Sequence, residues 1–168
     1  MTKIAKRRRR EGKTNYLKRI KLLKGEKPRV VFRRTNKYII AQYVTSKEAQ
    51  DRVEFGLTSK ILLNYGWPKE FKGSLKSIPA SYLTGYVFGK KINEKKLKEP
   101  IIDFGTLRTI HKTKVYAFLK GLIDAGIKIK FKKEIFPEEE RIKGKNLKKD
   151  FSEFFNKIKE KIENETRN

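Results

Sequence analysis

The sequence predicts an α/β fold, a mixed β-sheet with helices packed on it, flanked by a basic N-terminal arm and a C-terminal helical extension. Two apolar runs of β-forming residues, Arg29–Arg34 and Lys37–Val44, lie so close together that they must pair antiparallel. Beyond residue 77, helical and strand-like segments alternate, an order that allows parallel pairing within the same sheet. The 168 residues have room for one modest hydrophobic core and its extensions.

The hairpin formed by the first two strands carries three cations at its tip. We expect the turn at Thr35-Asn36, because Asn tolerates the left-handed conformation that a tight turn needs. Strand alternation places Phe32 and Arg34 on one face of the sheet and Arg33 on the other. Such a tip is either a solvated turn on a basic protein or a surface that grips a polyanion.

The other elements follow from hydrophobic periodicity and from helix stop signals. Before the hairpin, four apolar residues from Tyr16 to Leu23 predict a helix that ends at Gly25, whereas residues 1–12 lack any apolar pattern and should form a flexible arm. After the hairpin, the predicted segments are a strand over Arg52–Leu57, a short helix over Ser59–Tyr65, a long helix over residues 77–97, a buried strand over Glu99–Phe104, a helix over Lys112–Ala125, a short strand over Ile127–Phe131, a loop or helical turn after Pro137, and an amphipathic helix over residues 147–163.

The long helix has a clear start and two glycines. Ser77 is placed to cap it, and Pro79 suits its first turn. Gly85 and Gly89 lie on one side of this helix, where they either permit close packing or are simply tolerated. We divide the chain into the arm and its helix (residues 1–27), an α/β core (residues 28–131) and a C-terminal extension (residues 132–168).

Charge is the strongest compositional signal. Lysine and arginine number 44 against 19 acids, for a net charge of +25, and residues 1–37 alone contribute +14. Such an excess exceeds what solubility needs and destabilises the free protein by self-repulsion, so a polyanionic partner is expected. Nucleic acid is the first candidate and an anionic membrane surface a distant second, since no basic amphipathic anchor or lipidation signal supports the latter.

Other compositional features exclude several classes of protein. The chain has no cysteine, which excludes disulfides, thiolate zinc sites and cysteine nucleophiles. It has no apolar run long enough to span a membrane, and its N-terminus lacks the apolar core of a secretory signal. We therefore expect an intracellular, cytoplasmic protein that binds neither a membrane nor a small-molecule substrate.

Catalytic motifs are weakly represented. Asp103-Phe104-Gly105 spells the kinase metal-binding tripeptide, but the chain lacks the catalytic and glycine-rich loops that kinase chemistry requires. His111, the single histidine, has lysines nearby and no acidic partner in the pattern. A metal-dependent nuclease needs a cluster of carboxylates, for which Asp103 and Glu54 remain open candidates. We expect no cofactor and no metal.

Nucleic-acid binding has better support. Basic residues alternate with Tyr16, Phe32, Tyr38 and Tyr43, a mixture suited to neutralising phosphates and stacking on bases. By itself, the Arg7–Arg10 run also fits a nuclear-localisation signal or a non-specific arm. The cations of the following helix and hairpin favour a built RNA-binding surface.

The chain resembles one protein family over nearly its whole length, from Lys6 to about Asn146. The resemblance lies in RRRREGKTNYLKRIKLLKGEKPRVVFRRTNKYIIAQYV, YGW at 65–67, IPASYLTGYVFGKK, IIDFG and TKVYAFLKGLIDAGIKI, which occur in this order. The family that the chain resembles is the universal large-subunit ribosomal protein numbered eighteen, in its archaeal form. Its eukaryotic relatives are numbered five.

The resemblance implies a 5S rRNA-binding protein of the central protuberance with no catalytic role. It also implies contact with 23S rRNA, a neighbouring large-subunit protein numbered five in bacteria, and a three-layer fold with a ribonuclease-H-like motif. The family's RNA-contacting parts are the basic arm, the hairpin and, as a second contact, the loop Thr106–Lys114. On this chain they correspond to Arg7, Arg8, Arg9, Arg10, Lys13, Thr14, Tyr16, Arg19, Arg29, Arg33, Arg34, Asn36, Lys37, Arg108, Lys112 and Lys114.

Two other functions remain to be tested. An RNA-processing nuclease on the same fold would use Asp103 and Glu54. A non-specific architectural binder would use the same cations without preferring one RNA.

Overall fold

The computed structural model describes residues 4–71, 73, 75–147 and 149–165. Its sheet has the order β3-β2-β1-β4. The hairpin strands β1 (Arg29–Arg34) and β2 (Ile39–Lys47) are antiparallel, as are β2 and β3 (Gln50–Thr58), whereas β4 (Ile101–Asp103) runs parallel to β1. The predicted mixed sheet is confirmed.

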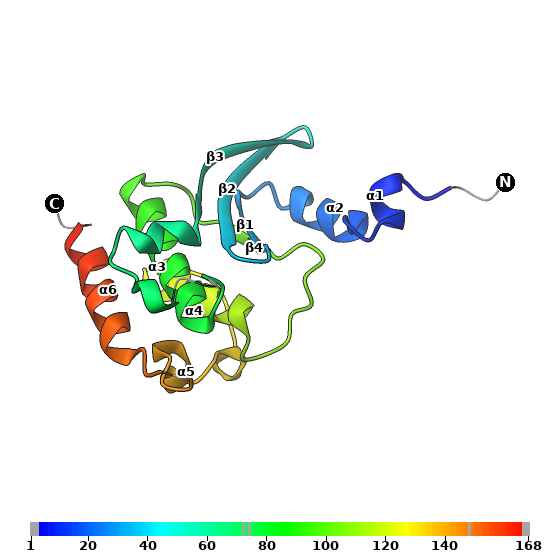
Figure 1. Cartoon of the computed structure of the whole chain (residues 1–168). Helices are drawn as coiled ribbons and strands as arrows, with labels where there is room; N and C mark the ends of the chain where they lie inside the picture. The colour runs from blue at the N-terminus through cyan, green and yellow to red at the C-terminus, as the bar shows by residue number, and fades with distance from the viewer. Residues whose placement is uncertain (1–3, 72, 74, 148, 166–168) are drawn as a thin grey trace.

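Helices surround this sheet unevenly. Figure 1 shows the N-terminal helices extending to one side of the molecule and the C-terminal helix lying on the opposite side. The helices are α1 (Arg7–Arg10), α2 (Tyr16–Lys24), α3 (Ile78–Glu94), α4 (Lys114–Asp124), α5 (Glu139–Lys143) and α6 (Ser152–Glu165), with 3-10 turns at Ser59–Leu63, Lys69–Phe71 and Lys133–Ile135.

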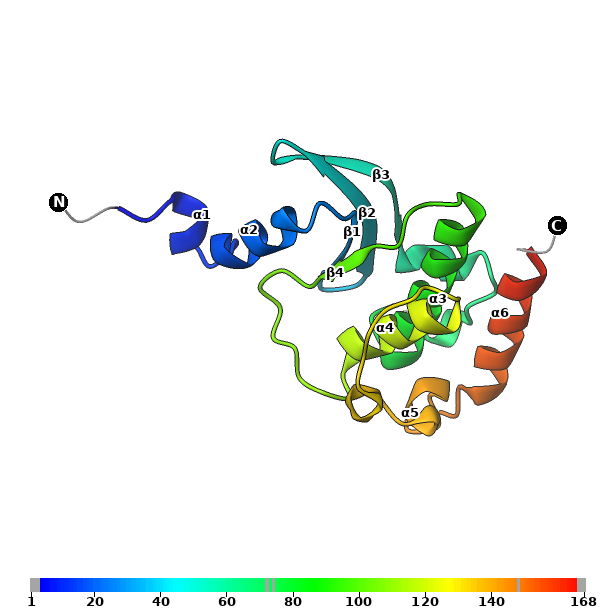
Figure 2. The same cartoon turned by 180° about the vertical axis from the view of Figure 1, so that it is seen from behind.

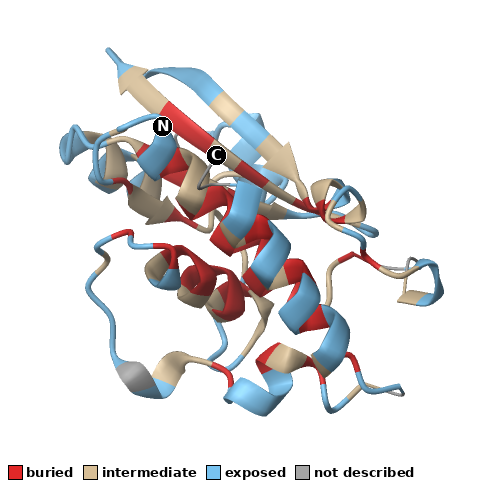
Figure 3. Ribbon diagram, turned by 90° about the vertical axis from the view of Figure 1, so that its left-hand side faces the viewer, coloured by how far each residue is buried: buried red, intermediate tan, exposed pale blue. Residues whose placement is uncertain are grey.

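Two hydrophobic clusters separate three layers. One lies between the sheet and the pair α3–α4, and includes Phe32 from β1 with Phe88 and Phe118 from the helices. The other lies on the far side of α3, where α6 packs Phe155 and Ile158 against the middle layer. Figure 3 shows α3 and α4 as the most buried helices, as expected for a layer that is covered on both sides.

The glycines of α3 permit close helix packing. A Cβ at Gly85 would overlap the carbonyl oxygen of Phe118 in α4, and a Cβ at Gly121 of α4 would overlap the carbonyl oxygen of Tyr82 in α3. The start of α4 is tied to α3 by the Ser81 hydroxyl, which donates to the carbonyl of Lys114 at 2.5 Å. These contacts fix where the first turn of α4 lies relative to the sheet.

Most predicted elements are present, and the caps of α3 are as expected. Ser77 accepts a hydrogen bond from the backbone N–H of Ala80, and a proline lies in the first turn. The hairpin turn differs from the expectation, because Asn36 is not left-handed. Instead, Thr35 closes the loop by accepting from the N–H of Tyr38 at 2.9 Å and donating to its carbonyl at 3.0 Å.

Two local predictions were wrong. Ile127–Phe131 is not a strand: Ile127 is buried and Ile129 packs against the core, so the apolar pattern reflects side-chain burial without backbone pairing. The short helix predicted after Ser59 is present, as a 3-10 helix over Ser59–Leu63. The arm contains one helical turn, α1, although none of its residues is buried. That turn is closed by local backbone bonds, which leave no trace in hydrophobic periodicity.

Candidate nucleic-acid interface

The two faces of β1 differ in chemistry. Val30 and Phe32 face the helices and are fully buried. The opposite face carries Arg29 and Arg33, so the alternation predicted from the sequence is confirmed. Because β4 is parallel to β1 with Val31 opposite Asp103, the carboxylate at the end of β4 lies beside both arginines.

Asp103 organises the end of this sheet. It accepts the backbone N–H of Gly105 at 2.7 Å, and its Oδ2 lies 3.6 Å from Arg29 and 3.4 Å from Arg33. Arg33 also donates to the carbonyls of Phe32 and Asp103 at 2.8 and 3.1 Å. Its guanidinium is therefore held in one orientation while 43% of the side chain stays exposed.

Arg29 is placed differently from the other predicted contacts. It is 2% exposed and donates to Asp51 at 2.6 Å and to the Ser46 hydroxyl at 3.0 Å. A buried guanidinium is tolerated only when it is paired in this way. In the free protein, Arg29 is thus a buried structural residue that pairs with Asp51 and Asp103.

Polar contacts anchor α2 to the sheet, since none of its residues is buried. Arg19 donates to Asp51 at 2.8 Å and to the carbonyl of Ala49 at 3.3 Å, while Lys18 donates to the carbonyl of Gly105 at 3.2 Å. Asn15 caps the helix by accepting the N–H of Lys18. These bonds hold the arm over the outer face of β1.

Asp51 joins the arm to the sheet. Its partial burial opposes ionisation, but hydrogen bonds from Arg19 and Ser46 and the charges of Arg29 and Arg19 together lower its pKa below the ordinary value. The carboxylate is therefore ionised at neutral pH. It bridges an arginine of α2 and an arginine of β1.

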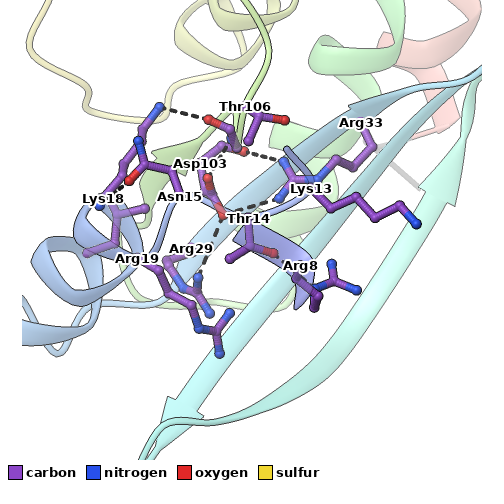
Figure 4. Close-up of a pocket in the computed structure, with 12 residues that line it drawn as sticks. Arg8, Lys13, Thr14, Asn15, Lys18, Arg19, Arg29, Arg33, Asp103 and Thr106 are labelled. Carbon is purple, nitrogen blue, oxygen red and sulfur yellow. Dashed lines mark hydrogen bonds and ion pairs between the residues drawn. The ribbon is translucent and has the colours of Figure 1, made fainter. Parts of the chain in front are cut away.

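A cationic pocket of about 140 Å³ opens where the arm, α2, β1 and the end of β4 meet. Figure 4 shows Asp103 between two arginines, with the side chains of the arm around them. Six cations and one carboxylate line the pocket. Its lining residues are Arg8, Lys13, Thr14, Asn15, Lys18, Arg19, Leu22, Arg29, Arg33, Asp103, Gly105 and Thr106.

The arm itself is exposed and partly organised. The guanidinium of Arg8 donates to the Thr14 hydroxyl at 3.0 Å, and Glu11 pairs with Lys13 at 2.8 Å. The ammonium of Lys6 lies 5.1 Å from the ring centre of Tyr16. Arg7, Arg9 and Arg10 are exposed and lie outside the pocket.

The remaining predicted residues lie at the hairpin tip and beyond it. Asn36 and Lys37 are exposed at the tip and line neither of the pockets described here. Arg34, Arg108, Lys112 and Lys114 line a second pocket. Those predicted residues that line a pocket therefore form two groups, one in each pocket, and the others lie outside both.

Sequence reasoning missed several residues of these surfaces. Lys18 and Asn15 line the first pocket, and Arg141 from α5 lines the second. Lys18 meets Gly105 across 87 positions of chain, so no local pattern could indicate the contact. Arg141 lies in a polar segment that predicted only a loop or a single turn.

The candidate catalytic groups do not converge. Asp103 of β4 is paired with arginines, while Glu54 lies on β3 at the opposite edge of the sheet, with β1 and β2 in between, and accepts from the Thr45 hydroxyl at 2.8 Å. His111 packs edge-on against Tyr116. Within the described residues, no three His, Asp or Glu side chains gather as metal ligands, and no helix is long and apolar enough to cross a membrane.

A mixed sheet with a cationic outer surface and an ordered basic arm defines a polyanion-binding α/β protein. The chain belongs to the family of ribosomal large subunit proteins described as 60S L5 and 50S L18, whose model matches residues 2–100. This is a family of structural ribosomal proteins, not of enzymes.

Similar proteins from three archaea agree with this assignment. Each is named large ribosomal subunit protein uL18. The protein of Korarchaeum cryptofilum is 46% identical over 86% of this chain and 72% of its own length. The protein of Methanosphaera stadtmanae is 44% identical over 86% of this chain and 73% of its own length. The protein of Methanothrix thermoacetophila is 42% identical over 84% of this chain and 82% of its own length.

Proposed function

We propose that this large-subunit ribosomal protein binds 5S rRNA and helps to attach it to the central protuberance. The observation that carries the proposal is the first pocket, where the arm, α2 and β1 bring six cations together on one side of the sheet. Arm and strand residues that are distant in sequence share this surface. Family membership makes ribosomal RNA its partner.

The parts of this surface have different roles. The exposed cations Arg7–Arg10 and Lys13 neutralise phosphates, largely without reading sequence. Arg33 is oriented by Asp103 and presents a fixed guanidinium, which suits recognition of RNA shape. Tyr16 and Thr14 supply an aromatic ring and a hydroxyl beside them.

The other proposed partners follow from the rest of the chain. The loop Thr106–Lys114 contacts 23S rRNA or a further part of 5S rRNA, and the molecule lies beside the ribosomal protein numbered five in bacteria. The arm (residues 1–27) and the core (residues 28–131) carry the RNA surface, while the extension (residues 132–168) completes the helical layers. The protein works in the cytoplasm, within the large ribosomal subunit.

Competition binding tests this proposal. Labelled 5S rRNA is bound to the protein near physiological salt and competed with unlabelled 5S rRNA, a size-matched folded RNA and duplex DNA. We expect 5S rRNA to compete at much lower concentration than the other two. Equal competition by all three would instead identify a non-specific architectural binder.

The same samples test the nuclease alternative. With magnesium present, the RNA should remain intact over the binding experiment. Cleavage that disappears in Asp103→Asn but persists in the control Glu160→Gln would contradict a purely structural role.

A further inference from the structure

A second pocket lies on the helix-facing side of the hairpin, away from the arm. Its volume is about 360 Å³, within the range of small-ligand sites. It is formed by the end of β1, the loop before α4, the starts of α3 and α4, and α5 of the C-terminal extension. Five separate parts of the chain thus build one concave site.

The floor of this pocket is apolar. Phe32 lies at its base and is fully buried, held by a tilted contact with Phe118 at 4.9 Å between ring centres. Because Phe32 has no exposed surface, the apolar surface that a ligand can contact is formed by Leu107 and Val115, with Ile110 at its edge, where 51% of the residue is exposed. An apolar floor beneath a cationic rim suits a ligand that has an apolar face and a negative charge.

The rim of the pocket is cationic and largely uncompensated. Arg34, Arg108, Lys114 and Arg141 line it, and no carboxylate of the described residues lies within ion-pair distance of any of them. Lys112 is the exception, since its ammonium pairs with Glu138 at 3.0 Å.

These cations lie close enough to one another to change the pKa of Lys114. Partial burial, and then the charges of Arg34 and Lys76, lower the pKa of Lys114 below its ordinary value. A bound anion would relieve this repulsion. Glu138 reduces the positive field nearby, since it pairs with Lys112 at 3.0 Å and its charge also interacts with that of Arg141.

The C-terminal extension is fixed against this site. The backbone N–H of Lys112 donates to the carbonyl of Ile135 at 2.8 Å, and Lys112 also reaches Glu138. Figure 2 shows α5 beneath the segment that leads into α4. Arg141 of the extension therefore lines the same pocket as Arg34 of the core.

We propose that this pocket receives one unstacked nucleotide of the bound RNA, with the base on the apolar floor and its phosphate between Arg34, Lys114 and Arg141. The inference rests on the proposed function, because the nucleotide comes from the same RNA. Arg33 and Arg34 are consecutive and point to opposite faces of β1, so RNA at the hairpin tip has direct access to both pockets. An acidic peptide would satisfy the rim but would leave the apolar floor without a planar partner.

Nuclear magnetic resonance of the full-length ¹⁵N-labelled protein tests this site with simple probes. AMP and UMP are titrated, with adenosine, inorganic phosphate and pentaglutamate in parallel. We expect the nucleotides to shift the amides of residues 107–115 and 141, with dissociation constants at least about fivefold below that of phosphate. Arg34→Ala and Arg141→Ala should each weaken AMP about three- to tenfold, while the charge-matched Arg52→Ala should not.

Several outcomes would overturn the inference. Phosphate binding as tightly as AMP would leave a plain anion site, and tighter pentaglutamate binding would indicate a protein partner. Unchanged spectra at residues 107–115, or shifts confined to Arg8 and Lys18, would equally contradict it. Arg141 is exposed, so its replacement by alanine should leave the fold intact. The spectrum of Arg141→Ala also reports directly whether the rest of the protein is folded.

Binding of 5S rRNA by the same samples separates this inference from the proposed function. A protein that prefers 5S rRNA but does not bind AMP at the second pocket would refute the inference alone. A protein that binds AMP there without preferring 5S rRNA would refute the 5S assignment and the RNA source of the nucleotide.

Discussion

Asp51 shows how one carboxylate can strengthen a cationic surface. It holds Arg19 of α2 at 2.8 Å and the buried Arg29 of β1 at 2.6 Å, so it lies between the arm and the sheet. Removing one partner of a buried ion pair costs about 3–5 kcal/mol, because the other charge is left uncompensated. The acid therefore orders the cations around it even though it reduces the net charge.

The first prediction concerns Asp51→Asn. Net charge rises by one, so electrostatic attraction alone would tighten RNA binding. We expect 5S rRNA binding to weaken about three- to tenfold near 150 mM salt, because α2 loses its anchor and the arm must be ordered at binding. Filter binding or fluorescence anisotropy measures it.

Glu160→Gln is the control for this substitution, since it makes the same change of charge on the exposed side of α6. Affinity in Asp51→Asn equal to or greater than that of the control would contradict an anchoring role.

The second prediction concerns Lys37 at the hairpin tip, which is exposed and belongs to neither pocket. If it contacts one phosphate, Lys37→Ala should reduce the slope of log K against log salt by about one unit. Binding at five or more salt concentrations gives the slope. An unchanged slope would remove Lys37 from the phosphate contacts.

At the scale of elements, α2 and α3 are stabilised by different forces. Twelve of the seventeen residues of α3 are buried, whereas α2 has no buried residue. Hydrophobic burial does not depend on pH, but the shortest of the contacts that hold α2, the Arg19–Asp51 ion pair at 2.8 Å, requires an ionised Asp51. The arm should therefore come loose under conditions that leave the core intact.

The third prediction is a pH dependence of arm docking. Because its pKa is lower in the docked state, Asp51 stabilises docking above its ordinary pKa, and this contribution is lost as pH falls through the lowered pKa. We expect amides of α2 to gain mobility below about pH 4, before those of β1 change. Nuclear magnetic resonance relaxation from pH 6 to 3 measures this order of events.

Asp51→Asn provides the control for the pH series, because α2 should already be mobile in it at neutral pH. Loss of order in α2 and β1 at the same pH in the wild-type protein would contradict separate stabilisation of the arm.

The fourth prediction concerns the contact between α3 and α4. Gly85→Ala places a methyl group against the Phe118 carbonyl and should destabilise the fold by about 1–3 kcal/mol or more. Gly25→Ala is the control, because a Cβ there makes only an ordinary 3.5 Å contact. Thermal unfolding of both variants compares their free energies of unfolding. Equal stability of Gly85→Ala and Gly25→Ala would contradict close packing of α3 against α4.

The sequence predicted α3, α4, α6 and the hairpin because each buries one regular stripe or face. It did not predict that Ile127–Phe131 lacks a strand partner, since burial alone produces the same apolar pattern. It also placed Arg29 among the RNA contacts, whereas the structure has this residue buried and paired with acids. Residue type and position do not show that Asp51 of β3 and Asp103 of β4 both pair with Arg29 of β1, which depends on the register of all four strands.

At the scale of the whole molecule, the first cationic pocket and the hydrophobic cluster under α6 lie on opposite sides. The arm and β1 carry the first cationic pocket, while α6 completes the hydrophobic layers on the far side of α3. A net charge of +25 destabilises the free protein by electrostatic self-repulsion. A bound polyanion neutralises part of this charge and so stabilises the folded protein. Binding and folding stability are thus linked through one surface.

The fifth prediction, and the most direct test of this account, is the salt dependence of 5S rRNA binding in Arg8→Gln/Lys13→Gln/Arg33→Gln. The control Arg52→Gln/Lys128→Gln/Lys157→Gln removes three exposed cations elsewhere. We predict that the slope of log K against log salt falls by about two to three units in the first variant and stays near the wild-type value in the control. Equal slopes in the two variants would contradict the claim that the arm and β1 form the RNA-binding surface.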